Sequence, residues 1–271
     1  MMREVSFGQY YPTKSFVHNL DARAKILFII AYVVLIFLAK NFYAFLAAGA
    51  LLLAIVVFSK VPLRLVIKSV KGVLFLVIFT ALLNLFFYNK GEVLFSWHFI
   101  TIHKQAVYYS AFMALRLTLL VMGTSLLTLT TTPVSLTDGI ESLLAPLKYI
   151  KFPVHELALI MSIALRFIPT LMEETDRIIC AQKARGADFE SGGILHRAKA
   201  MLPVLIPLLF SAFRRADELG DAMDARCYSG SKNRTKYKKL RLTWRDFVAA
   251  AVVGAAIYGV VALSRYFGAL L

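Results

Sequence analysis

The stretch QAVYYSAFMALRLTLLVMGTSLLTLTT, residues 105–131, decides the fold class of this chain. It carries a single charged side chain, Arg116, and it is long enough to cross the hydrocarbon core of a bilayer as a helix. These properties predict an all-α membrane protein with about five transmembrane helices. The other four apolar runs, of which the first is short, are 25–39, 42–59, 70–88 and 246–268.

The composition of the chain agrees with this class. Of the 271 residues, 59% are hydrophobic and the mean hydropathy is +0.69, which is too apolar for an ordinary soluble domain. Basic residues precede the first apolar run and no small-residue cleavage pattern follows it, so it is not expected to be a signal peptide. Cys180 and Cys227 fall in a part that we predict to be cytoplasmic, where a disulfide is not expected.

The distribution of positive charge predicts the orientation of the chain. The formal net charge is +15, and basic residues gather before the first apolar run, after the second and before the last. The positive-inside rule then predicts five crossings, with the N-terminus inside and the C-terminus outside. These cations would contact anionic lipid headgroups, and no nucleic-acid-binding module accompanies them. The second and third clusters are Lys60, Arg64, Lys68, Lys71, Lys232, Arg234, Lys236, Lys238, Lys239, Arg241 and Arg245.

This orientation divides the chain into three parts. Residues 1–131 are predicted to form a membrane domain with the first four transmembrane helices. Pro133 ends the fourth of these helices, because the residue before a proline is pushed out of the helical region. Residues 132–243 then form a cytoplasmic domain, and residues 244–271 carry the last transmembrane helix.

This cytoplasmic domain is predicted to contain one short and two long helices. The short helix covers about 135–150 and is opened by a capping box, a serine followed three residues later by an aspartate. The long amphipathic helices cover 153–185 and 194–226, and Pro203 and Pro207 are expected to perturb the second. Each long helix begins with an apolar half and ends with a charged half.

An alternative places the two long helices in the membrane as a further hairpin, which would give a seven-helix permease. Their apolar halves, 157–172 and 201–213, are short for crossing a bilayer. The alternative would also put four cations outside the cell, which the positive-inside rule disfavours. These cations are Lys183, Arg185, Arg197 and Lys199.

Both long helices end in a short motif that contains an arginine. A helix C-terminus carries partial negative charge, which orients a basic side chain there, and a following glycine lets the backbone turn away. The exposed guanidinium can then bind a carboxylate or a group of carbonyl oxygens in a partner. A single such motif could be ordinary capping chemistry, and the repetition is what favours a docking function. The motifs are Ala184-Arg185-Gly186 and Ala225-Arg226-Cys227.

Three features in combination are similar to a known family. They are the N-terminal segments Gly8-Gln9-Tyr10 and HNLDARAK (18–25), the Thr-Thr-Pro sequence at 131–133, and the two arginine motifs. Together they resemble the transmembrane T component of energy-coupling factor transporters, the EcfT/CbiQ family, over nearly the whole chain. The resemblance implies that the two motifs end crossed coupling helices, which dock into grooves on two ATP-binding-cassette ATPases.

The resemblance also implies the role of each motif. Arg185 and Arg226 would be the docking arginines, flanked by small residues. The chain departs from the family pattern at Cys227, where glycine is usual. We therefore expect the turn to lack a residue that adopts the left-handed conformation without strain. Docking should be retained because the arginine is present. A minor departure is Ala22, where the family usually has proline.

The function implied by the resemblance is that of a transmembrane scaffold. It would belong to an ECF-type ABC importer for vitamins or other micronutrients in the cytoplasmic membrane of a prokaryote. It would couple closure of two ATPase subunits to a separate membrane-embedded substrate-binding protein, the S component, which selects the substrate. An alternative is a self-contained secondary permease driven by an ion gradient, although the predicted spans hold acidic residues only near their ends.

No enzyme activity and no cofactor are expected for this chain. It lacks the Gly-x-x-x-x-Gly-Lys-Ser/Thr phosphate loop, so ATP would be bound by another subunit. The acids of the long helices fit no protease or diphosphate motif. We expect instead a solvated face with local ion pairs, Glu173 with Arg177 and Arg214 with Glu218.

Arg116 is the charged residue inside the predicted fourth span. A charge there is unfavourable unless it is paired or hydrated. It could contact the substrate-binding partner or a water path. The favoured interpretation is an internal hydrogen bond, with Asn84 of the third span as a possible acceptor.

Overall fold

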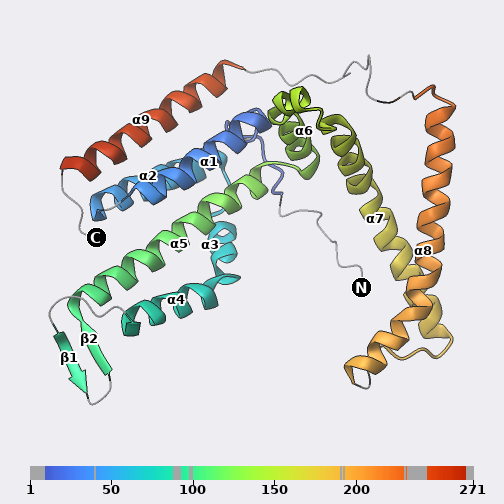
Figure 1. Ribbon diagram of the computed structural model, residues 1–271, viewed down its shortest axis with the longest axis horizontal. Helices are drawn as coiled ribbons and strands as arrows, with labels where there is room; N and C mark the ends of the chain where they lie inside the picture. Colours follow the sequence, from blue (N-terminus) through green and yellow to red (C-terminus); the bar gives the residue numbers. More distant parts are fainter. Residues whose placement is uncertain are drawn as a thin grey trace. The chain divides into compact units, whose positions relative to one another are not determined.

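The computed structural model describes residues 10–39, 41–87, 93–97, 100–189, 191, 193–228, 230 and 243–266. Gly8, Gln9 and the basic cluster from Lys232 to Arg241 lie outside the described residues. The described part is mainly α-helical, which confirms the predicted class (Figure 1). Its contacts divide the chain into two units, Met1–Leu143 with Leu240–Leu271, and Leu144–Lys239. The predicted boundaries at 131 and 243 separate membrane-spanning from cytoplasmic residues, which internal contacts do not define, so they stay predictions.

The first unit contains one helix for each predicted span and two further helices. The predicted third span is preceded by a short amphipathic helix, and the two axes are bent by 59° at the break between them. The helices are α1 (Ala22–Leu38), α2 (Phe42–Ser59), α3 (Leu63–Lys71), α4 (Leu74–Phe87), α5 (Lys104–Thr130), α6 (Pro133–Leu143) and α9 (Trp244–Tyr266).

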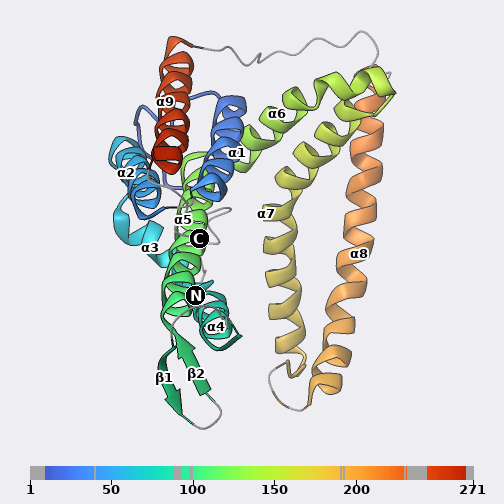
Figure 2. The ribbon, with the colours of Figure 1, turned by 60° about the vertical axis from the view of Figure 1, so that its left-hand side comes forward.

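A β-hairpin between α4 and α5 was not predicted from the sequence. Strands β1 (Val93–Trp97) and β2 (Ile100–His103) pair in antiparallel fashion, and Figure 2 shows them beyond the adjoining ends of α4 and α5. Strands this short give no periodicity that distinguishes them from the apolar runs on either side. The hairpin adds a small element to a helical fold.

Within the described residues, five helices are long and apolar enough to cross a membrane, and the bent pair α3–α4 could supply a sixth crossing. The five are α2, α5, α9 and the two long helices of the second unit, α7 (Val154–Ala184) and α8 (Ile194–Asp224). The number agrees with the prediction, but α1 and α4 have only 17 and 14 residues. Which helices cross, and in which direction, stays a prediction.

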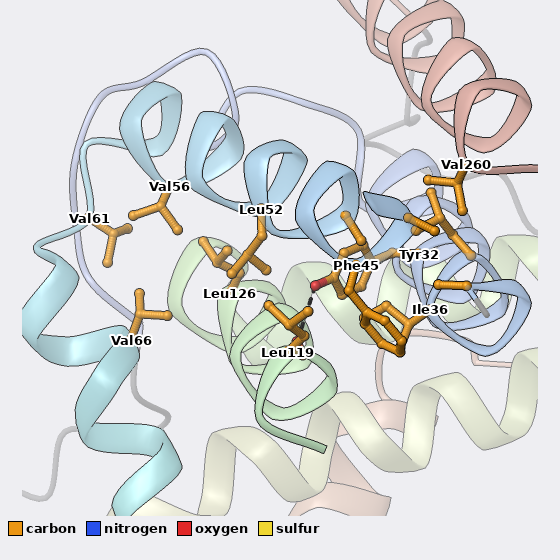
Figure 3. Close-up of a cluster of buried hydrophobic side chains, with 14 of the residues drawn as sticks. Tyr32, Ile36, Phe45, Leu52, Val56, Val61, Val66, Leu119, Leu126 and Val260 are labelled. Carbon is orange, nitrogen blue, oxygen red and sulfur yellow. Dashed lines mark hydrogen bonds between the residues drawn. The ribbon is translucent and has the colours of Figure 1, made fainter. Parts of the chain in front are cut away.

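The core of the first unit lies where α5 meets α1, α2 and α3, with α9 on the outer side of α1 and α2. Leu35, Ile36 and Phe45 are at most 1% exposed, and Leu119 and Leu126 of α5 pack among them (Figure 3). The Tyr32 hydroxyl donates a hydrogen bond of 3.1 Å to the carbonyl of Leu119. The outward faces carry exposed large hydrophobic side chains, as expected for helices in contact with lipid.

The short helix begins earlier than predicted and is capped by a different residue. Thr132 accepts a 3.3 Å hydrogen bond from the backbone N–H of Ser135, so Thr132 and not Ser135 is the capping side chain. Pro133 suits the first helical position because it lacks an N–H. α6 ends at Leu143 and packs on α1, and a 3₁₀ turn over Ala145–Ile150 is the first element of the second unit.

The second unit consists mainly of α7 and α8, which run side by side in opposite directions (Figures 1 and 2). Each has 31 residues and continues through its internal prolines. Glu174 of α7 joins them, because it accepts hydrogen bonds from the Ser211 hydroxyl and, at 2.7 Å, from the Arg215 guanidinium of α8. Glu174 and Arg215 thus form an ion pair between the two helices. The predicted local pairs of Glu173 and of Arg214 do not form.

Candidate functional site

The first arginine motif forms a complete helix C-cap at the end of α7. The backbone N–H of Arg185 donates to the carbonyls of Ala181 and Gln182, at 3.3 and 3.1 Å. The N–H of Ala187 then reaches back 3.0 Å to Gln182, which closes the turn. Gly186 sits in the left-handed region with φ +88°, the conformation that this type of helix ending requires.

The second motif repeats this geometry at the end of α8. The backbone N–H of Arg226 donates a hydrogen bond of 3.1 Å to the carbonyl of Met223. The N–H of Tyr228 donates a second one, of 3.0 Å, to the same carbonyl. Cys227 adopts φ +55° and therefore occupies the left-handed position that Gly186 occupies in α7. The turn therefore forms without the glycine that adopts this conformation freely, because the closing hydrogen bond imposes the left-handed conformation on Cys227.

Both arginines present their side chains away from the protein. Arg185 and Arg226 are exposed, and neither guanidinium has a hydrogen bond or an ion pair with any residue that the structure describes. Each guanidinium therefore has its five N–H donors available to a partner. We call residues 184–187 and 225–228 the two arginine tips.

The antiparallel arrangement places the two arginine tips at opposite ends of the helix pair (Figures 1 and 2). A helix of 31 residues is about 46 Å long at a rise of 1.5 Å per residue. The structure therefore gives the tips the same local geometry but does not bring them together. They form two separate exposed surfaces.

The helix pair between the tips contains a polar cleft. It has a volume of about 400 Å³ and is lined by Thr170, Glu173, Arg177 and the bonded pair Glu174–Arg215. Gln182, near the first tip, also donates a 3.4 Å hydrogen bond to the carbonyl of Pro203 in α8. These contacts connect α7 to α8.

Arg116 makes an internal contact, as favoured, but with a different partner. Its guanidinium donates a hydrogen bond of 3.1 Å to the carbonyl of Ala39, just past the end of α1. It also lies 5.5 Å from the centre of the Phe45 ring. The amide of Asn84 donates 2.8 Å to Thr80 in its own helix. The last carbonyl groups of a helix receive no hydrogen bond from within the helix, so those at the end of α1 are available to accept one from the Arg116 guanidinium.

The HNLDARAK segment joins the ends of three helices. The Lys25 ammonium donates 2.9 Å to the carbonyl of Thr130, at the end of α5, and 3.0 Å to that of His18. Asp246 of α9 accepts 2.9 Å from the backbone N–H of Asp21, next to α1. Lys25, Asp21 and Asp246 are buried, so these contacts fix α1, α5 and α9 against one another.

The sequence interpretation did not assign roles to Lys25 and Asp246. Two signals could have drawn attention to them. Lys25 stands in the first turn of an apolar helix, and Asp246 stands at the third position of α9, where a carboxylate can accept from free backbone N–H groups. The Asp246 carboxylate accepts a hydrogen bond of 2.7 Å from the backbone N–H of Thr243.

Comparison with known proteins gives the family. The family model for the cobalt transport protein CbiQ matches residues 13–237. The chain belongs to the EcfT/CbiQ family. It is accordingly a transmembrane component of an energy-coupling factor transporter and a multi-pass protein of a prokaryotic cell membrane.

Several curated relatives are similar over almost their whole length, and each is named energy-coupling factor transporter transmembrane protein EcfT. The relative from Ruminiclostridium cellulolyticum is 50% identical over 252 residues, 93% of this chain and 94% of its own. That from Brevibacillus brevis is 51% identical over 254 residues, covering 93% and 95%. That from Bacillus subtilis is 46% identical over 259 residues, covering 95% and 98%.

Proposed function

We propose that this chain is the scaffold that couples two ABC-type ATPase subunits to a separate membrane-embedded substrate-binding protein. The observation that carries the proposal is the equivalence of the two arginine tips. They share one backbone hydrogen-bond pattern and one left-handed position, and both guanidinium groups are exposed and unpaired among the described residues. Two equivalent tips fit two equivalent partner subunits.

The proposed coupling follows from the connection between the tips. Each ATPase would bind one tip, with the guanidinium held by carboxylate or carbonyl groups of a groove. When ATP binding brings the two ATPases together, the tips would move relative to each other. The bond between Glu174 and Arg215 would link α7 and α8 as they move relative to each other, and the membrane helices would pass this motion on.

We further propose that an exposed apolar stripe on α8 contacts the substrate-binding protein. Leu202, Ile206, Leu209 and Phe213 follow the i, i+4, i+7, i+11 spacing of one helix face and are 50–61% exposed. Exposed apolar surface of this kind is typical of a protein or membrane interaction site. Its partner would select the vitamin or other micronutrient, so the substrate is not encoded in this stripe.

The test is replacement of both docking arginines. We expect Arg185→Ala with Arg226→Ala to abolish ATPase co-purification and uptake of the transported micronutrient, because loss of an arginine at an interface hot spot costs about 2 kcal/mol or more. The matched control replaces one exposed arginine in the body of each helix, Arg166→Ala with Arg214→Ala. Normal uptake by the tip variant, at normal membrane levels, would exclude the docking proposal.

The alternative function, an ion-driven permease, is favoured by the length and apolar character of α7 and α8. Cys180 and Cys227 are both exposed and free, so each can be labelled from one side of the membrane in a variant that lacks the other. The scaffold proposal expects both thiols to react only from the cytoplasmic side. ATP-independent uptake by the purified chain in liposomes would establish the permease.

A further inference from the structure

A deep apolar groove runs between α1, α2, α5 and α9 in the first unit. Its volume is about 450 Å³, within the usual range for ligand pockets of about 300–1,000 Å³. Ile29 of α1, Ile55 of α2 and Leu127 of α5 line its interior, and Ala249 and Val252 of α9 form one wall. Val252 is 54% exposed, so this wall is open to the surroundings of the protein.

Water is a poor occupant for this groove. A buried water needs two to four polar partners, and nearly all the lining side chains are hydrocarbon. The polar groups at one end are Lys25 and Thr130, and the ammonium already bonds to the Thr130 carbonyl. The surroundings of a transmembrane helix bundle are lipid acyl chains, which match the chemistry of the lining.

An unpaired cation stands at one end of the same wall. Arg245 precedes Ala249 by four residues and Val252 by seven, so the three residues share one face of α9. The Arg245 side chain is half-buried and has no hydrogen bond or ion pair among the described residues. Asp246, the next residue, is buried and bonded to Asp21, which fixes the rotation of α9 and therefore the side on which Arg245 lies.

We propose that this groove binds a membrane phospholipid, with one acyl chain in the groove and the phosphate at Arg245. A planar guanidinium binds phosphate oxygens through two parallel hydrogen bonds. The lipid would fill the space that α1, α2, α5 and α9 leave open, and would thereby support the position of α9. This inference is independent of the ATPase-docking function.

The experiment uses the full chain in vesicles of phosphatidylethanolamine and phosphatidylglycerol. A small fraction of the phosphatidylglycerol carries a diazirine in one acyl chain, and labelled residues are mapped after irradiation. We expect labelling of Ile29 and Leu127 inside the groove. Ala249→Phe, which fills the groove, should lower that labelling by about tenfold, equivalent to about 1.4 kcal/mol.

The matched control is Ala251→Phe, two residues away on the same helix but on an exposed face. It adds the same side chain outside the groove and should leave the labelling unchanged. Arg245→Gln alters the phosphate contact without adding volume, so it tests the proposal even if Ala249→Phe does not fold. We expect it to reduce the phosphatidylglycerol that stays bound through detergent washing, as counted by native mass spectrometry.

Three results would overturn the assignment. The first is equal labelling of the groove in the Ala249→Phe and Ala251→Phe variants. The second is unchanged lipid retention in Arg245→Gln. The third is loss of groove labelling when the chain is reconstituted with its co-purifying partners, which would assign the groove to a partner helix.

Discussion

The two units of this chain use helices of similar length in opposite ways. In the first unit α5 contacts α1, α2 and α3 around a shared core, and Leu35, Ile36 and Phe45 are almost fully buried. In the second unit α7 and α8 have 31 residues each, yet the buried side chains among its described residues are only Val154, Ala158, Val204 and Ser211. The first unit is stabilised by its own packing, whereas the second leaves most of its surface for other molecules to cover.

This difference separates two kinds of substitution. In the first unit, replacing a buried side chain should reduce the free energy of unfolding, because the packing of several helices depends on it. In the second unit, replacing an exposed side chain should leave stability nearly unchanged and alter association. The following predictions compare matched residues in the two units.

The largest effect is expected for truncation of a core phenylalanine. Phe45 is 1% exposed, and its ring centre lies 5.6 Å from that of Phe112. Phe45→Ala should lower the free energy of unfolding by about 3–5 kcal/mol, measured by thermal unfolding in detergent. Its counterpart, Phe210→Ala in α8, replaces a side chain that is 71% exposed and should change stability by less than about 0.5 kcal/mol. Equal losses in both variants would contradict the comparison.

A smaller effect, opposite in sign between the units, is expected for glycine-to-alanine changes. A Cβ at Gly123 would overlap the ring of Tyr32, whereas a Cβ at Gly220 of α8 would meet nothing within 4 Å. Gly123→Ala should lower stability by about 1–3 kcal/mol through overpacking. Gly220→Ala should raise it by up to about 1 kcal/mol, because alanine favours a helix. A gain in both variants would show that α1 and α5 are not closely packed.

The two arginine tips allow an internal comparison within the second unit. Both need a left-handed residue, which is unfavourable for a non-glycine side chain by about 1–2 kcal/mol. Cys227→Gly should therefore strengthen the end of α8, and Gly186→Ala should weaken the end of α7 by a similar amount. Amide hydrogen exchange at Tyr228 and Ala187 would report the two changes. Exchange that changes in the same direction at both sites would contradict the shared geometry.

The smallest effect concerns His18 in the first unit. Burial lowers the pKa of His18 below its usual 6.5, and the nearby positive charge of Lys25 lowers it further, against a hydrogen bond to the Tyr11 carbonyl. The folded protein therefore favours the neutral ring. This contribution to stability is present above pH 6.5 and is lost as the pH falls toward the lower folded pKa.

The measurement is the midpoint of thermal unfolding at several pH values below neutrality. The wild-type chain should lose stability more steeply than His18→Gln as the pH falls through this range. Identical slopes would mean that His18 is equally protonated in the folded and unfolded chains.

Much of the helical framework could be predicted from the sequence, because its signals are local. The apolar runs at 42–59 and 105–131 became α2 and α5 with ends within about one residue. Gly186 predicted the end of α7 because a left-handed residue closes a helix. The same local reasoning failed at Cys227, since the sequence shows no glycine there and only the hydrogen bond from Tyr228 reveals the conformation.

The sequence by itself determined that this chain is a helical membrane protein of the EcfT/CbiQ family with an arginine at the end of each long helix. Hydrophobicity and helix endings act within a few turns of chain, so a single sequence contains them. Only the tertiary structure decided which distant residues meet. Lys25 bonds to a carbonyl 105 residues away, and Glu174 bonds to Arg215 rather than to a neighbour in its own helix. Such pairs depend on how the helices pack. The periodicity of a helix in the sequence shows which of its faces is apolar, but not which residue of another helix that face will contact.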